Sequence, residues 1–201
     1  MLLMVANRCC VALESLPRVF HVADLTLRLG WEPRFALQEL YRWNRLGFVC
    51  SLGGQSGVYA NLIVSKYPDW EMGLRVVMPS AVISGLEVLR RAGWITQIPY
   101  LITVTVNAAQ RVCQVDRFEV NVQGPEWFDD MAAGMRSGEG VALPSLVPAW
   151  ALADMVRQEG WCDCGVGPDD IYWDLVTMSD QRDWAVACAA LGLGKLPMNP
   201  G

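Results

Sequence analysis

The sequence predicts an α+β protein in which a helical segment ending in a hairpin precedes a mixed α/β domain with a mostly helical tail. Three observations predict this class. Apolar residues follow a helical period up to Gly47, β-like runs flank a glycine-rich turn at residues 53–57, and β-branched runs alternate with helical ones beyond residue 72. The 201 residues, 53% of them hydrophobic and 18% charged, are enough for a packed core.

Helices are predicted at residues 9–16, 21–29 and 33–46, where the apolar spacing is helical. Pro33 suits the first turn of the third helix, because the amide hydrogen that proline lacks has no helical partner there. Gly47 is a typical helix stop. The stretch RLGWEP is then a tight turn between the second and third helices.

A hairpin is predicted after Gly47, with FVCSL and GVYANLI as strands around the turn. Three helices followed by a hairpin is the element order of a winged helix-turn-helix. The polar, proline-containing segment SKYPDWEM predicts a boundary. We therefore expect a winged helix-turn-helix domain at residues 1–66 and a mixed α/β domain at residues 67–201.

The second domain alternates between strand-like and helix-like runs, and no internal repeat is visible. Its tail, from residue 146 onward, is predicted to be mostly helical. The expected elements before the tail are a strand at LRVVMP, a helix at SAVISGLEVLRRAGW, and strands at YLITVTV and RFEVNV.

Charge is unevenly distributed along the chain, whose formal net charge is -5. Residues 1–64 contain six arginines and four acidic residues, a net charge of +2, whereas the remainder contains ten basic and seventeen acidic residues, a net charge of -7. Such asymmetry indicates a division between a part that faces a polyanion and an acidic part.

The predicted helix at 33–46 has one cationic face. Successive residues advance by about 100° around a helix axis, which brings one polar set within about 80° of Arg34 and places Ala36, Leu40 and Trp43 on the opposite side. Arginine can bind guanine or phosphate, and glutamine can bridge adenine, so this face fits a DNA major groove. The predicted DNA-binding residues of this helix are Arg34, Gln38, Tyr41, Arg42 and Arg45.

The hairpin supplies the other predicted DNA contacts, Gln55, Ser56 and Tyr59, which could touch the sugar-phosphate backbone. Its tip has no Lys or Arg, so the helix arginines would supply most of the affinity. The alternative is that the arginine face is an ordinary solvated helix surface, and Glu32 and Glu39 weaken its positive potential.

Three stretches resemble the AbiEi-type antitoxins and their winged-helix relatives. The stretch ALQELYRWNRLGFVCSLGGQSGVYA is similar to the winged helix of that family, and MPSAVISGLEVLRRAGWITQIPYLITVTV is similar to its second domain. LPSLVPAWALADMV resembles the proline-bounded helix that precedes the family's C-terminal helices. The resemblance extends from about residue 20 to residue 160.

The resemblance implies a two-domain transcriptional autorepressor. Such a protein binds operator repeats in double-stranded DNA through the winged helix and counters a nucleotidyltransferase toxin through the rest of the chain. By this resemblance, Arg34, Gln38, Arg42 and Arg45 lie on the recognition helix, and Gln55, Ser56 and Tyr59 lie in the wing.

We predict no catalytic site, no cofactor and no metal site. The run GGQSG lacks the lysine that a phosphate-binding loop requires. Cys162 and Cys164 could supply two zinc ligands, but no second spaced cysteine pair completes a set of four. His21, the sole histidine, is expected at a helix start in a half-buried position. The acidic pairs 129–130 and 169–170 point apart on a helix.

The expected location is the cytoplasm, since neither a signal peptide nor an apolar span of about 18 residues is present. The seven cysteines are expected to be reduced thiols. Seven of the nine tryptophans lie in the acidic part, where an exposed one would suit a protein interface.

The main hypothesis is thus a DNA-binding repressor and antitoxin rather than an enzyme. The alternatives are a protein-interaction module and a solitary ligand-sensing regulator, each with a degenerate winged helix. The sequence leaves the oligomeric state open.

Overall fold

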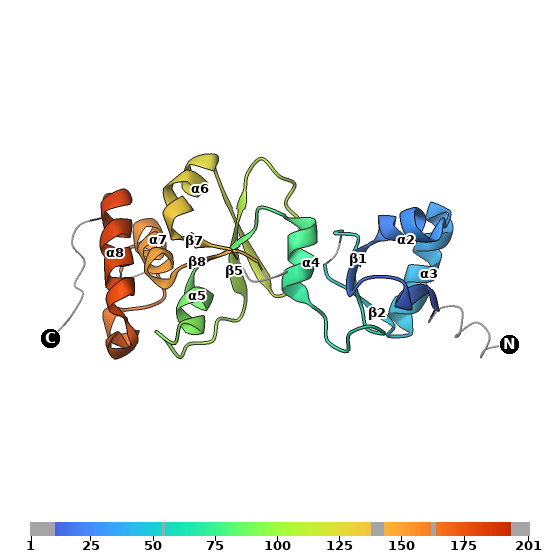
Figure 1. Ribbon diagram of the computed structural model, residues 1–201, viewed down its shortest axis with the longest axis horizontal. Coiled ribbons are helices and arrows are strands. Elements are labelled where there is room, and N and C mark those ends of the chain that lie inside the picture. The colour runs from blue at the N-terminus through green and yellow to red at the C-terminus, as the bar shows by residue number, and fades with distance from the viewer. Residues whose placement is uncertain (1–10, 54, 138–142, 162–163, 194–201) are drawn as a thin grey trace. The chain divides into compact units, whose positions relative to one another are not determined.

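The computed structural model describes residues 11–53, 55–137, 143–161 and 164–193. It is a mixed α+β fold with two sheets, one three-stranded and one five-stranded, as the α+β prediction requires (Figure 1). The chain divides into two compact units. Unit 1 consists of residues 1–79 and 113–116, and unit 2 consists of residues 80–112 and 117–201.

Unit 1 combines short strands with helices in close agreement with the predicted order. Strands β1, β3 and β2 form an antiparallel sheet in that order, and β2 pairs with β3 in the predicted hairpin. The β1 strand was not predicted. Residues 11–14, within the predicted first helix, are helical. The elements are β1 (Val19–His21), α2 (Val22–Leu29), α3 (Pro33–Arg45), β2 (Val49–Ser51), β3 (Val58–Asn61) and α4 (Trp70–Val77).

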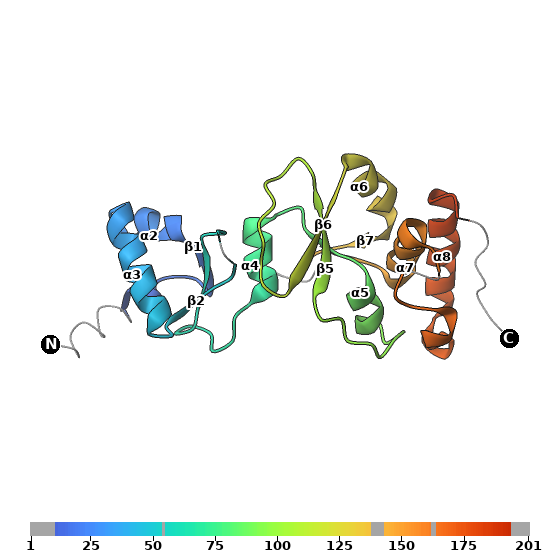
Figure 2. The same ribbon diagram turned by 180° about the vertical axis from the view of Figure 1, so that it is seen from behind.

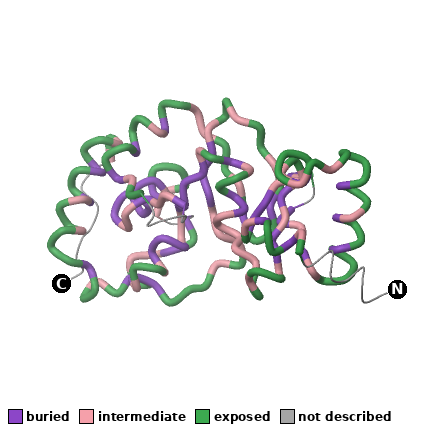
Figure 3. The backbone as a smooth tube through the Cα atoms, turned by 45° about the vertical axis from the view of Figure 1, so that its right-hand side comes forward, coloured by how far each residue is buried: buried purple, intermediate pink, exposed green. Residues whose placement is uncertain are grey.

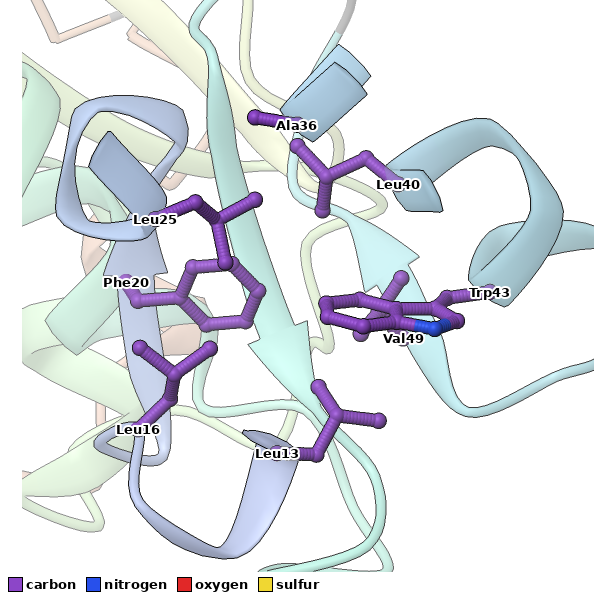
Figure 4. Packing of buried hydrophobic residues seen from close by; sticks show 8 residues of the cluster. All are labelled: Leu13, Leu16, Phe20, Leu25, Ala36, Leu40, Trp43 and Val49. Atoms are coloured by element: carbon purple, nitrogen blue, oxygen red, sulfur yellow. The ribbon is translucent and has the colours of Figure 1, made fainter. Parts of the chain in front are cut away.

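One apolar cluster joins the helices of unit 1 to its sheet. Leu25 from α2 and Leu40 and Trp43 from α3 pack with Phe20 from β1, and all four are at most 1% exposed (Figure 4). Asn61, at the end of β3, is fully buried and its side-chain amide donates to the Leu13 carbonyl at 2.7 Å. The cluster fixes which side of α3 faces inward.

The stretch LRVVMP, predicted as a strand, belongs to helix α4. Asp69 caps this helix by accepting a hydrogen bond from the Met72 amide at 3.0 Å, and Gly73 and Leu74 are buried. Gly73 lies so close to Leu52 that a Cβ there would clash with it. Because α4 belongs to unit 1, the structural division follows Pro79 rather than the predicted boundary after residue 66.

Unit 2 is built on a mixed sheet with strand order β6-β5-β4-β8-β7. Strands β5 and β6 are parallel over six residue pairs, β4 is antiparallel to β5, and β4 is parallel to β8. The elements are β4 (Val82–Ile83), α5 (Leu86–Arg91), β5 (Ile102–Asn107), β6 (Phe118–Gln123), α6 (Pro125–Met131), β7 (Met135–Arg136), β8 (Ser145–Leu146), α7 (Pro148–Glu159) and α8 (Met178–Ala190), with 3-10 turns at Ala132–Gly134, Pro168–Asp170 and Trp173–Leu175.

The predicted helix at 80–94 is shorter in the structure because its first residues form β4. Gly85 has a φ of 68°, a left-handed conformation that favours glycine, and α5 begins after it. The two predicted strands match β5 and β6, and the helical tail contains α7 and α8, which lie side by side (Figure 2).

Buried segments concentrate in the strands and along one side of several helices (Figure 3). Helix α7 is the most deeply buried, with Ala149, Trp150, Ala151 and Leu152 all at most 2% exposed. None of the helices in the described ranges has the length and apolar character needed to span a membrane.

Candidate nucleic-acid interface

Helix α3 begins and ends where its sequence predicts. The Glu32 carboxylate accepts a hydrogen bond from the Phe35 amide at 3.1 Å, and Pro33 occupies the first turn. At the other end Gly47 has a φ of 72°. The thirteen residues give a rod about 20 Å long at about 1.5 Å per residue.

The two faces of α3 differ as the rotation argument predicts. Ala36, Leu40 and Trp43 are at most 1% exposed and pack into the core. All five residues predicted to contact DNA from this helix are exposed, namely Arg34, Gln38, Tyr41, Arg42 and Arg45. The structure therefore brings these side chains together on one solvent-facing side.

The charges of this face are only partly neutralised. The Arg42 guanidinium lies 3.6 Å from the Glu39 carboxylate, and the Arg45 guanidinium lies 5.9 Å from the centre of the Tyr41 ring. Arg34 has no ion pair among the described residues. A surface ion pair contributes at most about 1 kcal/mol, so Arg42 remains available to another anion.

Apolar side chains border the arginines. Leu37 on α3 is 57% exposed, and Tyr41 one turn further on is 68% exposed. On the preceding helix, Leu27 of α2 is 80% exposed. The exposed side of α3 therefore offers both cationic and apolar contacts.

Ser56, predicted to contact DNA from the hairpin, is buried in the structure. Its side chain is only 9% exposed. The hydroxyl donates to the Gly53 carbonyl at 2.8 Å and accepts from the Val58 amide at 3.1 Å. Both bonds close the turn of the hairpin, so this hydroxyl holds the turn rather than facing a ligand.

Tyr59, the third residue predicted to contact DNA from the hairpin, packs part of its ring against the core. It is half-buried, and its ring stacks on Phe20 with centroids 6.0 Å apart. Tyr59 lies on β3, the central strand of its sheet, where the phenol packs against the core. Of the three predicted hairpin residues, only Gln55 is exposed.

A segment distant in sequence covers the hairpin turn. Gly53 is buried, and a Cβ at this position would clash with the Gln114 carbonyl. Residues 113–116 belong to unit 1 although they follow β5 in sequence. Glycine is required at Gly53 for this close approach, which is a packing role.

His21 takes the position expected of it. Its Nδ1 accepts a hydrogen bond from the Ala23 amide at 3.1 Å, and its own amide donates to the Asp24 carboxylate at 2.9 Å. These two bonds form a capping box at the start of α2. The histidine therefore orients the helix that precedes α3.

One residue of each acidic pair, and Cys164, makes a hydrogen bond within the fold. Asp130 accepts from Arg157 at 2.8 Å, and Asp170 accepts from the Gly167 amide at 2.8 Å. The buried Cys164 thiol donates to the Val166 carbonyl at 3.3 Å, whereas Cys162 lies outside the described residues. Nowhere in the described ranges do three metal-ligating side chains gather.

Comparison with known proteins gives a similarity of fold to a solved structure. No protein-family model matches the chain, and no curated protein matches it. The crystal structure of RV2827C protein from Mycobacterium tuberculosis is similar with a TM-score of 0.50 and 17% identity, over 94% of this chain and 77% of that chain. At this identity the similarity concerns the fold alone.

Proposed function

We propose that unit 1 is a winged helix that binds double-stranded operator DNA, with α3 as the recognition helix. The observation that carries the proposal is the outward side of α3, where Arg34, Arg42 and Arg45 surround Gln38 and Tyr41. A helix about 20 Å long fits a major groove, which is about 12 Å wide. Arginine binds phosphate and guanine there, and Gln38 is the candidate for reading adenine.

The hairpin has a secondary role in this proposal. Gln55 is its exposed polar side chain, and it could reach the sugar-phosphate backbone beside the groove. With Ser56 buried in the turn and Tyr59 in the core, the hairpin supplies position rather than charge. Most of the affinity would come from α3.

The biological role we propose is repression by an antitoxin of the AbiEi type in the cytoplasm. Support comes from the resemblance of residues 36–60, 78–106 and 143–156 to that family. In this role unit 2 would bind a nucleotidyltransferase toxin. The first step of the test is to look for a nucleotidyltransferase toxin gene next to the gene for this chain. Co-expression of this protein with that toxin should restore the growth of cells that make the toxin. Growth arrest despite co-expression would argue against the antitoxin role.

The DNA-binding proposal is tested by titrating a labelled fragment of the chain's own promoter with the full-length protein. The triple variant Arg34→Gln, Arg42→Gln and Arg45→Gln should bind at least tenfold more weakly. Arg182→Gln is the matched control, because Arg182 is an exposed arginine on α8 in unit 2. Equal affinity of the wild type and the triple variant would exclude α3 as the reader.

A second candidate function is protein interaction through exposed apolar side chains of unit 1. The exposed Leu27, Leu37 and Tyr41 favour it, since apolar and aromatic side chains contribute most to protein interfaces. Light scattering tests whether the protein self-associates. If it does, and if the Leu27→Ser, Leu37→Ser variant is monomeric but binds DNA with unchanged affinity, the protein interaction is separate from DNA binding.

A further inference from the structure

Unit 2 contains a sheet face that is polar where a packed sheet is normally apolar. Along β5, Val104 and Val106 alternate with Thr103 and Thr105, so the threonines share the opposite face. The register pairs Thr103 with Glu119 and Thr105 with Asn121 on the neighbouring strand β6. These side chains form a continuous polar strip across two parallel strands.

Helix α7 faces the same strip across a cavity of about 240 Å³. Thr103, Glu119 and Asn121 line it from the sheet, and Asp154, Gln158 and Glu159 line it from the helix. Asp154 and Gln158 are four residues apart and so lie on one side of α7, and Glu159 lines the cavity from the end of the helix. The cavity lies wholly within unit 2.

Asp154 is the most deeply buried charge-bearing group at this cavity, only 5% exposed. Its carboxylate accepts hydrogen bonds from the Trp127 indole at 3.0 Å and the Gln158 amide at 2.8 Å. Burial raises the pKa of Asp154 above its ordinary value, against the opposing effect of these two hydrogen bonds. Both hydrogen-bonding partners are neutral, and the charge of Arg157 also acts to lower this pKa.

The other two carboxylates lack partners within the described part of the chain. Glu119 and Glu159 are exposed and make no hydrogen bond or ion pair there. Among the described residues, no lysine, arginine or histidine lines the cavity. Three carboxyl groups and two amides thus surround a space that a compact organic group can fill.

We propose that this cavity binds the guanidinium or ammonium group of a ligand. A guanidinium presents planar pairs of N–H donors that match carboxylate oxygens, and the carboxylates, amide oxygens and threonine hydroxyl here are all acceptors. The same chemistry could reach the cavity as a free cationic small molecule or as an arginine side chain of a partner protein. The experiment separates these two sources.

The test is isothermal titration calorimetry on the full-length protein with three probes. Agmatine represents a free small cation, N-acetyl-arginine amide represents a protein side chain, and N-acetyl-citrulline amide is the uncharged isostere. We expect at least one cationic probe to bind with a Kd below about 1 mM, and the citrulline probe at least tenfold more weakly. Agmatine binding alone indicates a small ligand, and binding of the arginine probe indicates a partner side chain.

Substitutions of the cavity carboxylates test whether the cationic probes bind in the cavity. Glu119→Gln with Glu159→Gln should weaken the cationic probe by roughly tenfold or more, because a charge-assisted hydrogen bond is about twice as strong as a neutral one. Asp129→Asn, on the exposed side of α6, is the matched control and should bind as the wild type does. Glu119→Gln alone serves if circular dichroism shows that the double variant is unfolded.

Three results would overturn the proposal. The first is no heat of binding for either cation at concentrations up to about 10 mM. The second is equal binding of the citrulline probe, and the third is unchanged affinity in the Glu119 and Glu159 variants. Each result is read independently of DNA binding, because the cavity belongs to unit 2.

Discussion

The two units arrange their polar groups in opposite ways. In unit 1 the core under α3 is apolar and the cationic groups lie on the outward side of the helix, as Trp43 and Arg42 illustrate. In unit 2 polar groups line a cavity beneath α7, where Asp154 is buried and Glu119 and Glu159 are exposed. An outward charged face suits a large polyanion, whereas a polar cavity suits a compact ligand.

Removal of an anchor from the unit 1 core should have the largest effect. Trp43→Ala deletes a fully buried ring and should lower the free energy of unfolding of unit 1 by about 3–5 kcal/mol. Trp43→Phe should cost less, because the buried indole N–H has no hydrogen-bond partner in the structure. The free energy of unfolding of each unit is measured by denaturant titration, with amide hydrogen exchange as the probe of the individual units. A loss spread equally over both units would show that their cores are not independent.

The ion-pair cluster of α5 should have the next largest effect. Glu87 is 5% exposed, and the side chains of Arg90 and Arg91 each donate to it at 2.7 Å. The Arg90 guanidinium, with Arg91, holds the pKa of Glu87 below its ordinary value despite burial. Glu87→Gln should lower the free energy of unfolding by about 1–3 kcal/mol at neutral pH.

The pH dependence of this cluster follows from the lowered pKa. The stabilisation is present above the unfolded pKa of about 4.3 and is lost as the pH falls through the lower folded pKa. The difference between the wild type and Glu87→Gln in thermal melts should therefore shrink below about pH 4. A difference that stays constant between pH 7 and pH 3 would contradict the assigned ion pairs.

Ser56 tests whether the hairpin turn is structural. Ser56→Ala removes two hydrogen bonds and should lower the free energy of unfolding by about 1 kcal/mol. Gln55→Ala, one residue away and exposed, should leave stability unchanged. Chemical denaturation of both variants separates them. Equal stability of the two variants would contradict a structural role for the Ser56 hydroxyl and would favour the predicted contact with DNA.

Asp154 should have the smallest effect on stability, and of the opposite sign. Because burial raises its folded pKa, the ionised group disfavours the native state as the pH rises through that pKa. Asp154→Asn should raise the free energy of unfolding at pH 7 by up to about 1 kcal/mol, and this gain should vanish below about pH 4. A variant less stable than the wild type at pH 7 would show that the hydrogen bonds from Trp127 and Gln158 outweigh burial.

Local signals in the sequence were sufficient for α3 and its faces. Pro33 and Gly47 mark its ends, and a simple rotation separates Arg34 from Trp43. The same reasoning misread α4, since Val76 and Val77 favour a strand by propensity. There the Asp69 cap and the packing of Gly73 against Leu52 decide the structure.

The features of the two candidate sites that the sequence did not predict depend on contacts between residues distant in sequence. The burial of Gly53 depends on Gln114, which lies after β5. The strands β5 and β6 were each predicted, but their parallel pairing, which aligns Thr103 with Glu119, leaves no local signal. The cavity under α7 is a product of that pairing, so its lining could not be assembled from the sequence alone.

The most direct test of the proposed DNA-binding face is the salt dependence of promoter binding. Each phosphate contact contributes a slope of about −0.9 to log K against log salt concentration, so three arginines of α3 predict about −2.7 per chain. The slope should fall to nearly zero in the Arg34→Gln, Arg42→Gln, Arg45→Gln variant and stay unchanged in Arg182→Gln. An unchanged slope in the triple variant, or no salt dependence in the wild type, would contradict the account.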